Sequence, residues 1–242
     1  MNRFRHLCAF AVLGLLLSGC GSPPPGRPKK DAETIAPDQI VEFTTLYAQN
    51  CAGCHGAQGR GGAAIALADP VYLAIANEAS MRKVIVNGVH GTSMPAFAQS
   101  AGGMLTDKQV DAITSGIFSR WARKGILEGS ILPSYAAKTA GNAAKGELVY
   151  GTYCASCHGA GGQGTPKGSA VTNDSFLALA SDQGLRTIVI AGRPELGAPD
   201  WRGNVPGKPM TDQEITDVVA WLASRRVQNP GQPYSASNYG RH

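Results

Sequence analysis

Cys51-Ala52-Gly53-Cys54-His55 and Cys154-Ala155-Ser156-Cys157-His158 are two copies of one five-residue pattern, 103 residues apart in a chain of 242. Two cysteines with two residues between them place their sulfurs about one porphyrin edge apart, so both thiols can add to the vinyl groups of a haem. The His that follows then lies beneath the iron as its proximal ligand. The pattern therefore predicts two covalently attached haems, one on each motif.

Two other uses of Cys-x-x-Cys fit this sequence less well. A structural zinc site needs four ligands per metal, and the chain has five His, none paired in an H-x₃₋₅-H arrangement near either motif. A thioredoxin-like motif lies in a βαβ pattern, whereas both motifs here follow helical stretches and lead into Gly-rich loops. Both copies therefore favour haem attachment.

The N-terminal residues predict export and a lipid anchor. An apolar run from Leu7 to Leu17 follows a pair of Arg, which is the pattern of a secretory signal over residues 1–19, too short for a membrane span. Leu17-Ser18-Gly19-Cys20 resembles the lipidation box of bacterial lipoproteins, which implies lipid on Cys20. An ordinary cleaved signal with an unmodified Cys20 is the alternative. The Pro-rich residues 20–37 predict an extended tether.

The cysteine count agrees with export. Four of the six cysteines belong to the haem motifs, Cys20 to the lipidation box, and Cys8 would leave with the signal, so no pair remains for a disulfide.

The net charge of the mature chain is small. The formal charge of +5 falls when Arg3 and Arg5 leave with the signal, because 20 of the 22 Lys and Arg then remain with 17 Asp and Glu. Haem propionates would lower it further. A nucleic acid partner has no electrostatic support.

The two halves of the chain form an internal repeat. Tyr47 and Tyr150 precede the two motifs at the same distance. Other matching pairs are Tyr72-Leu73-Ala74 with Phe176-Leu177-Ala178, Asn87-Gly88 with Ala191-Gly192, and Thr106-Asp107 with Thr211-Asp212. Since the offset grows only from 103 to 105 residues, both halves share one fold. The expected organisation is a first domain over 38–121, a linker over 122–141, a second domain over 142–228 and a flexible tail over 229–242.

Each half is expected to be all-α, with long Gly-rich loops. A helix precedes each haem motif, and a middle helix covers residues 72–86 or 176–190. The last helix begins after Thr106 or Thr211, because Thr is a good N-cap and acidic residues follow both of them.

Residues 38–228 resemble the class I cytochrome c family in these motifs and helices. The resemblance implies two tandem cytochrome c domains, each wrapped around one covalent haem. In that family the first and last helices of a domain cross closely, with a Gly facing an aromatic ring. Alignment places Phe43 against Gly116 in the first half and Gly146 against Trp221 in the second.

Residues Gly91–Phe97 resemble the family's ligand loop, which implies that the Met94 thioether is the sixth ligand of the first haem iron. Three other side chains are weaker candidates. His90 falls four residues too early. Met81 lies in the middle helix and is expected in the core, and Met104 is expected to make an apolar contact at the start of the last helix.

The second half departs from this pattern, because Ala198 stands where the first half has Met94. An Ala methyl cannot bind iron, so haem 2 is either five-coordinate, water-ligated or closed by another residue. Met210 is the candidate ligand, provided that residues 198–210 refold to bring its thioether to the iron. Its alternative role is an apolar contact at the helix start. His242, at the end of the tail, is the other downstream imidazole and a weaker candidate for the same ligand position.

Arg82 and Arg186 occupy matching places in the two halves. Both could pair with haem propionates. A solvated helix face explains them as well, and we favour it.

These features predict an electron carrier rather than an enzyme: a dihaem cytochrome c, lipid-anchored on the periplasmic side of a bacterial membrane. Its redox partners would be a quinol-oxidising complex, a terminal oxidase or a dehydrogenase. A haem enzyme or small-ligand-binding protein, using an open sixth position at haem 2, is the alternative. The chain could also be a bound subunit of a larger respiratory complex, with its polar tail lying on a partner.

Overall fold

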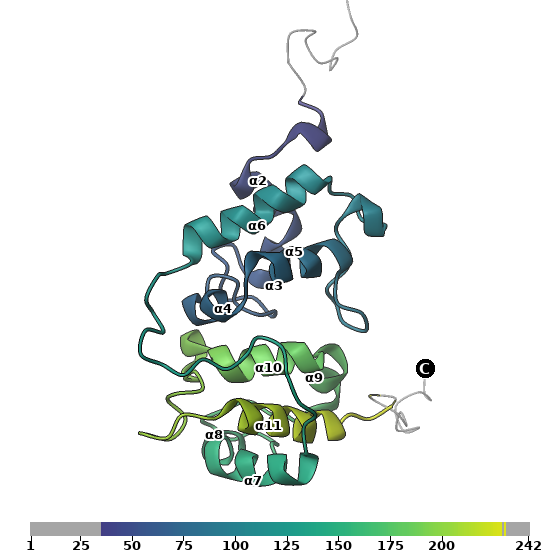
Figure 1. Cartoon of the computed structure of the whole chain (residues 1–242). Helices are drawn as coiled ribbons and strands as arrows, with labels where there is room; N and C mark the ends of the chain where they lie inside the picture. Colours follow the sequence, from purple (N-terminus) through teal and green to yellow (C-terminus); the bar gives the residue numbers. More distant parts are fainter. Residues whose placement is uncertain (1–34, 229, 231–242) are drawn as a thin grey trace, which may run out of the picture. The chain divides into compact units, whose positions relative to one another are not determined.

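The computed structural model of the protein describes residues 35–228 and 230, and its regular structure consists of α-helices and short 3-10 turns (Figure 1). Within these residues the only β-type pairings are isolated bridges. The all-α expectation is therefore confirmed. The predicted signal peptide, Cys20, most of the tether and most of the tail, with His242, lie outside the described residues. No helix in the described part is both long and apolar enough to cross a membrane.

The first half contains five α-helices and two 3-10 turns. They are η1 (Pro37–Gln39), α2 (Phe43–Asn50), α3 (Ala52–His55), α4 (Pro70–Ile75), α5 (Glu78–Asn87), η2 (Gln99–Ala101) and α6 (Asp107–Trp121). The second half repeats the order of the α-helices with α7 (Ala143–Tyr153), α8 (Ala155–His158), α9 (Asp174–Leu179), α10 (Asp182–Ala191) and α11 (Asp212–Ser224), and its 3-10 turn η3 (Pro194–Leu196) does not correspond to η2. The repeat read from the sequence is thus a repeat of helices.

The prediction of one continuous middle helix in each half was wrong. In the first half α4 ends before Ala76 and α5 begins after Asn77, whose Oδ1 accepts a hydrogen bond from the Ser80 N–H at 2.8 Å. In the second half Ser181 caps α10 in the same way, with Oγ accepting from the Gly184 N–H at 3.1 Å. A side-chain cap satisfies an amide that a continuing helix would bond to its own carbonyls, so each cap starts a new helix.

The N-caps of the last helices were predicted correctly. Thr106 and Thr211 each form a capping box, the first with Gln109 and the second with Glu214. Each threonine hydroxyl accepts from the N–H three residues on, and the partner side chain accepts from the threonine N–H. These reciprocal bonds fix where α6 and α11 begin.

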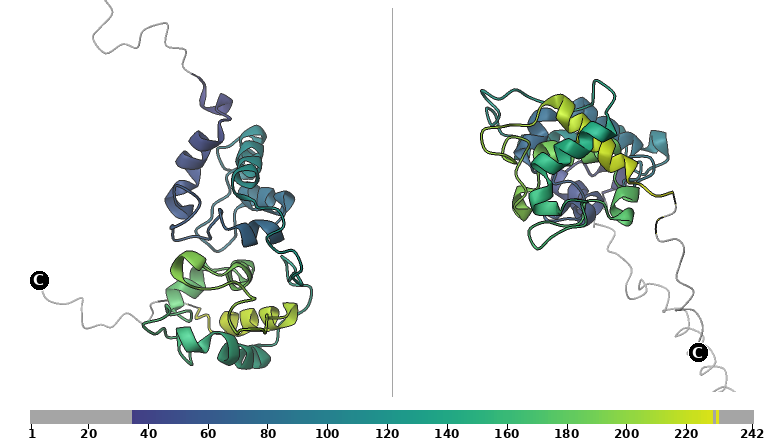
Figure 2. Two further views of the ribbon diagram at one scale, coloured as in Figure 1. Left: turned by 90° about the vertical axis from the view of Figure 1, so that its left-hand side faces the viewer. Right: turned by 90° about the horizontal axis from the view of Figure 1, so that it is seen from below.

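The first and last helices of each half cross at a glycine, as predicted. A Cβ built on Gly116 of α6 would stand 2.1 Å from the Phe43 ring of α2. A Cβ on Gly146 of α7 would stand 2.0 Å from the Asp217 carbonyl oxygen and 2.8 Å from the Trp221 Cβ in α11. Figure 2 shows α11, in yellow-green, lying directly along α7, in teal. The glycine of the crossing lies on the last helix, α6, in the first half and on the first helix, α7, in the second half.

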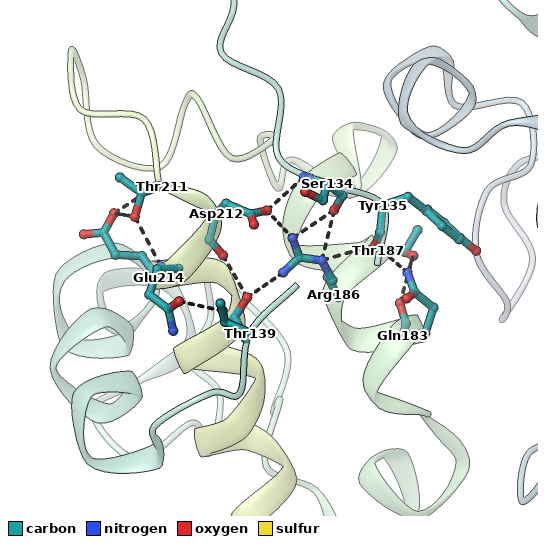
Figure 3. A network of polar contacts seen from close by, with 11 residues as sticks. Ser134, Tyr135, Thr139, Gln183, Arg186, Thr187, Thr211, Asp212 and Glu214 are labelled. Carbon is teal, nitrogen blue, oxygen red and sulfur yellow. Dashed lines mark hydrogen bonds and ion pairs between the residues drawn. The ribbon is translucent and has the colours of Figure 1, made fainter. Parts of the chain in front are cut away.

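The segment between the halves is hydrogen-bonded along the second half (Figure 3). The Ser134 N–H donates to the Asp212 carboxylate at 2.9 Å, the Thr139 hydroxyl to Gln213 at 2.7 Å, and the Asn142 N–H to Asp217 at 2.8 Å. We call residues 130–142 the strap. It runs over α10 and α11, and a pocket of about 220 Å³ lies beneath it.

Arg186 of α10 is buried beneath the strap and binds it, so the expectation that this residue lies on a solvated helix face was wrong. Its side chain is 2% exposed, forms an ion pair with Asp212, and donates to the Ser134 carbonyl oxygen at 2.8 Å (Figure 3). The matching Arg82 is 39% exposed and pairs with Asp107 and Asp111 on α6. Both guanidinium groups are paired with carboxylates of the last helix, and pairing of either with a haem propionate stays a prediction.

Candidate haem sites

The two Cys-x-x-Cys-His motifs have the same local structure. In each, the first Cys is the residue between two helices, and the next four residues form one short helical turn, α3 or α8, that ends at the His. The first cysteines, Cys51 and Cys154, are partly buried, and the second cysteines, Cys54 and Cys157, are exposed; all four are free thiols. One turn of helix thus presents two thiols and an imidazole together.

The histidines of the two motifs are oriented by backbone carbonyls. Nδ1 of His55 lies 2.7 Å from the carbonyl oxygen of Ile65, and Nδ1 of His158 lies 2.7 Å from that of Ser169. A carbonyl oxygen can only accept, so Nδ1 carries the proton in both rings and Nε2 is left with its lone pair free for a metal. Burial also lowers the pKa of His55, which keeps its imidazole neutral.

A glycine ends each haem turn. Gly56 and Gly159 follow the two histidines with φ of 81° and 83°, in the region that side chains disfavour. A Cβ on Gly56 would stand 1.7 Å from the Arg60 carbonyl oxygen, so the chain must also pass close by at this point. The Gly after each motif is therefore required by the turn that carries the histidine into its Gly-rich loop.

Two tyrosines brace the same turns, a role that the sequence analysis missed. The Tyr47 hydroxyl donates to the Gly56 carbonyl oxygen at 3.0 Å, and the Tyr150 hydroxyl donates to that of Gly159 at 2.7 Å. Burial, with a smaller effect of Cys154, raises the pKa of Tyr150 to about 12, so its hydroxyl remains a donor at neutral pH. The identical spacing of these tyrosines before both motifs was the available signal.

The first cysteine of each motif has a protonated thiol before haem attachment. Burial, with a contribution from Cys54, raises the pKa of Cys51 to about 11. Burial and Cys157 do the same for Cys154. No group of three or more His, Cys, Asp and Glu side chains suited to a metal ion occurs within the described residues. Two thiols beside an imidazole with a free Nε2 fit a covalent haem with a His-ligated iron, and the donor set of both motifs is the same.

The ligand loops of the two halves share a closing backbone hydrogen bond, although the second loop contains the 3-10 turn η3 and the first has no such turn at that place. The Met94 carbonyl oxygen accepts from the Val89 N–H at 2.9 Å, and the Ala198 carbonyl oxygen accepts from the Arg193 N–H at 3.0 Å. Met94 is partly buried, as is Ala198. The structure therefore puts Ala198 at the position of Met94, as counting along the sequence predicted.

Met210 corresponds to a different residue of the first half. Its N–H donates to the Trp201 carbonyl oxygen at 3.0 Å, and the Leu105 N–H donates to that of Phe97 at 2.8 Å. Met210 is 3% exposed and Leu105 is 6% exposed. The structure thus places Met210 in the core, at the place that Leu105 fills in the first half. As ligands of an iron, Met94 and Met210 both stay predictions.

The other ligand candidates of the first half are placed as follows. His90 is exposed, and Met81 is 3% exposed in the core, as predicted. The expected apolar contact of Met104 was wrong, because its side chain is 84% exposed.

Comparison with known proteins identifies the repeated unit. The sequence model of the family described as cytochrome C oxidase, cbb3-type, subunit III matches residues 38–115 and again 141–222. The Cbb3-type cytochrome c oxidase subunit CcoP of Azospirillum sp. (strain B510) is 36% identical over 131 residues, and that of Azospirillum brasilense is 32% identical over 132. Each alignment covers 50% of this chain. The chain spans about two fifths of these curated relatives, 39% and 40% of their lengths.

Similar solved structures are more distant. A chain of the reducing HAO-like protein complex of Kuenenia stuttgartiensis aligns at 16% identity and a TM-score of 0.41, covering 76% of this chain and 96% of that one. The thiosulfate dehydrogenase TsdBA of Marichromatium purpuratum aligns at 22% identity and a TM-score of 0.29, covering 81% and 48%. At these scores neither likeness supports a conclusion. The family match confirms the tandem cytochrome c domains and, with them, two covalent haem c groups.

Proposed function

The chain belongs to the family of cbb3-type cytochrome c oxidase subunit III, and we propose that this dihaem electron-transfer protein delivers single electrons to a terminal oxidase. The observation that carries the proposal is the repeated haem turn, in which each histidine has Nδ1 bound to a carbonyl and Nε2 free. A haem bound there supplies an iron that changes oxidation state by one electron. The relatives named as oxidase subunits support the choice of partner.

The residues of the chain act by holding each haem without doing chemistry on a substrate. The paired cysteines bind it covalently, and the histidine, oriented by a backbone carbonyl, supplies the proximal ligand. Met94, partly buried in its loop, supplies the sixth ligand in the first half, and a His–Met pair raises the reduction potential. Electron transfer breaks no bond and needs no acid or base, so we propose a carrier rather than an enzyme.

The test is reoxidation by an oxidase. Holoprotein with two haems per chain is reduced with ascorbate and mixed with a purified cbb3-type oxidase that lacks its own CcoP subunit, under oxygen. We expect oxygen consumption to rise with the concentration of the holoprotein and to saturate. The double variant Cys51→Ser, Cys54→Ser, which loses the haem of the first half, should support much slower turnover. Oxygen consumption that does not depend on the holoprotein would contradict the proposal.

We also propose that Cys20 carries a lipid that anchors the protein on the periplasmic side of a membrane. The sequence supports it through the Leu17-Ser18-Gly19-Cys20 box and the Pro-rich residues that follow. Cell fractionation tests it: the full chain should sediment with membranes, and Cys20→Ala should be found in the soluble periplasmic fraction. Cys8→Ala is the matched control and should remain with the membranes. Full-length protein in the soluble fraction would rule out the anchor.

A further inference from the structure

Ala198 replaces Met94 in a loop that keeps the same length and the same closing hydrogen bond. Both loops run six residues from a glycine, Gly88 or Gly192, to the ligand position, and both close with the same carbonyl hydrogen bond. A Cβ on either glycine would meet the carbonyl of the ligand-position residue, at 2.6 Å for Met94 and 2.7 Å for Ala198. The substitution therefore removes the thioether and keeps the carbonyl of the ligand-position residue against the same glycine, although the second loop contains η3 between them.

Met210 is held in the core by its own contacts. Its N–H is bonded to the Trp201 carbonyl oxygen, and the next residue, Thr211, is fixed by the capping box that starts α11. Its sulfur accepts a hydrogen bond from Asn204 Nδ2 at 3.9 Å. Moving this thioether to an iron would break its contact with Asn204 and empty a core position at which Met210 is 3% exposed, and moving the backbone would break the other bonds.

The other side chains of the second half that ligate haem iron in proteins are also engaged. Tyr150 is 1% exposed, with its hydroxyl bonded to Gly159, and Tyr153 donates to Glu214 Oε1 at 3.3 Å. The described residues of the second half hold no His besides His158 and no Met besides Met210. No side chain of this set replaces Met94.

We propose that Ala198 leaves the sixth coordination position of haem 2 open, and that this position binds small uncharged ligands of the type of carbon monoxide. The proposal rests on the two haems of the proposed function. Two observations set the ligand class: the three residues around the position, Gly197-Ala198-Pro199, offer no polar side chain, and the charges flanking them are paired. Arg193 lies 2.5 Å from Glu195, and Arg202 lies 2.7 Å from Asp200.

The same surroundings argue against turnover of a substrate. Distal hydrogen-bond donors and an acid or base favour activation of a bound molecule over simple binding. Asp200 is the nearest carboxylate in the sequence, and three hydrogen bonds from the Arg202 guanidinium hold it. The position is therefore suited to reversible binding.

The experiment uses holoprotein with two haems per chain, confirmed by pyridine haemochrome assay, in four forms: wild type, Met210→Leu, Ala198→Met and Met94→Ala. Two quantities are measured. One is the weak near-infrared charge-transfer band of Met–iron ligation in the oxidised protein, and the other is the number of carbon monoxide molecules bound by the reduced protein. Met210→Leu copies the residue that the first half has at this place, so the core should tolerate it.

We expect wild type to bind one carbon monoxide per chain and to show the band of one Met-ligated haem. Met210→Leu should change neither quantity. Ala198→Met should double the band and abolish binding, and Met94→Ala should abolish the band and raise binding to two. Loss of half the band in Met210→Leu would overturn the proposal, and so would a wild-type protein that binds no carbon monoxide. A chain with fewer than two haems would contradict the proposed function itself.

Discussion

Gly146 of α7 lies so close to Asp217 of α11 that a Cβ on it would stand 2.0 Å from the Asp217 carbonyl oxygen. The helices can approach this far only because residue 146 has no side chain, and backbone on one side meets backbone on the other. In the first half the corresponding crossing has a ring, Phe43, against Gly116. An aromatic ring can turn aside, but a helix carbonyl cannot move without moving the helix.

Gly146→Ala should therefore destabilise the holoprotein by about 3 kcal/mol. Overpacking a close contact commonly costs about 1–3 kcal/mol, and the upper value applies because a backbone carbonyl can move aside less than a side chain can. Gly151→Ala in the same helix is the matched control. Its Cβ would meet nothing within 4 Å, so we expect it to stabilise by about 0.5–1 kcal/mol through helix propensity. Denaturant midpoints of the two holoproteins measure both effects. Equal effects at the two glycines would contradict the close crossing.

Arg186→Met should destabilise the second half by about 3 kcal/mol, because it leaves Asp212 and the Ser134 carbonyl without the buried guanidinium that binds both. Arg82→Met removes the matching residue of the first half, which is exposed and pairs with two exposed carboxylates. Its effect should be much smaller. Denaturant unfolding followed at the two haems separates the halves. A larger effect of Arg82→Met would contradict the buried contact.

Glu42 caps α2 with its carboxylate, which accepts from the Thr44 and Thr45 N–H groups at 2.8 and 2.6 Å. These bonds lower the pKa of Glu42 from 4.5 to about 2. A folded pKa below the unfolded value means that the stabilisation is present above about pH 4.5 and is lost as the pH falls toward 2. The difference in denaturant midpoint between wild type and Glu42→Gln should therefore shrink over that range.

The control for this pH dependence lies in the second half. Asn142 caps the corresponding helix α7 with a neutral amide oxygen, which accepts from the Lys145 N–H at 3.0 Å. The loss of stability in Asn142→Ala should be the same at pH 4.5 and at lower pH. A parallel pH dependence in both variants would show that Glu42 is not its source.

Redox titration of the wild type should resolve two waves, since a Met ligand raises the potential of a His-ligated haem and only the first half has Met in its ligand loop. Met94→Ala should lower the upper wave and leave the lower one. Ala198→Met should raise the lower wave toward the upper. A single wild-type wave would contradict the assignment of Ala198 to the ligand position.

Much of the fold could be predicted from the sequence because its determinants are local. The haem turns follow from five consecutive residues, and the starts of α6 and α11 follow from Thr106 and Thr211 with their partners three residues on. The break before α5 and α10 has the same kind of local signal, in Asn77 and Ser181, but the apolar periodicity across it predicted one helix. A cap and a periodic pattern compete at such a position.

The features that could not be predicted depend on contacts far along the chain. The buried state of Arg186 depends on a carbonyl at Ser134, 52 residues earlier, and every residue offers a carbonyl, so the sequence carries no sign of the contact. The sequence likewise gives no sign that the carbonyls of Ile65 and Ser169 orient the histidines of the two motifs. The prediction for Met104 was wrong because two apolar residues precede the cap of α6, and the one that packs in the core is Leu105, which is 6% exposed.

The strap changes where the second domain should be cut from the chain. A fragment beginning at Asn142 would keep every helix of that half, yet it would remove Ser134 from Arg186 and Asp212, and Thr139 from Gln213. A fragment beginning just before Ser130, whose hydroxyl accepts from Arg202 at 3.3 Å, would keep them. For anyone who transplants this haem module into another protein, the usable boundary lies ahead of the strap, about a dozen residues before the first helix.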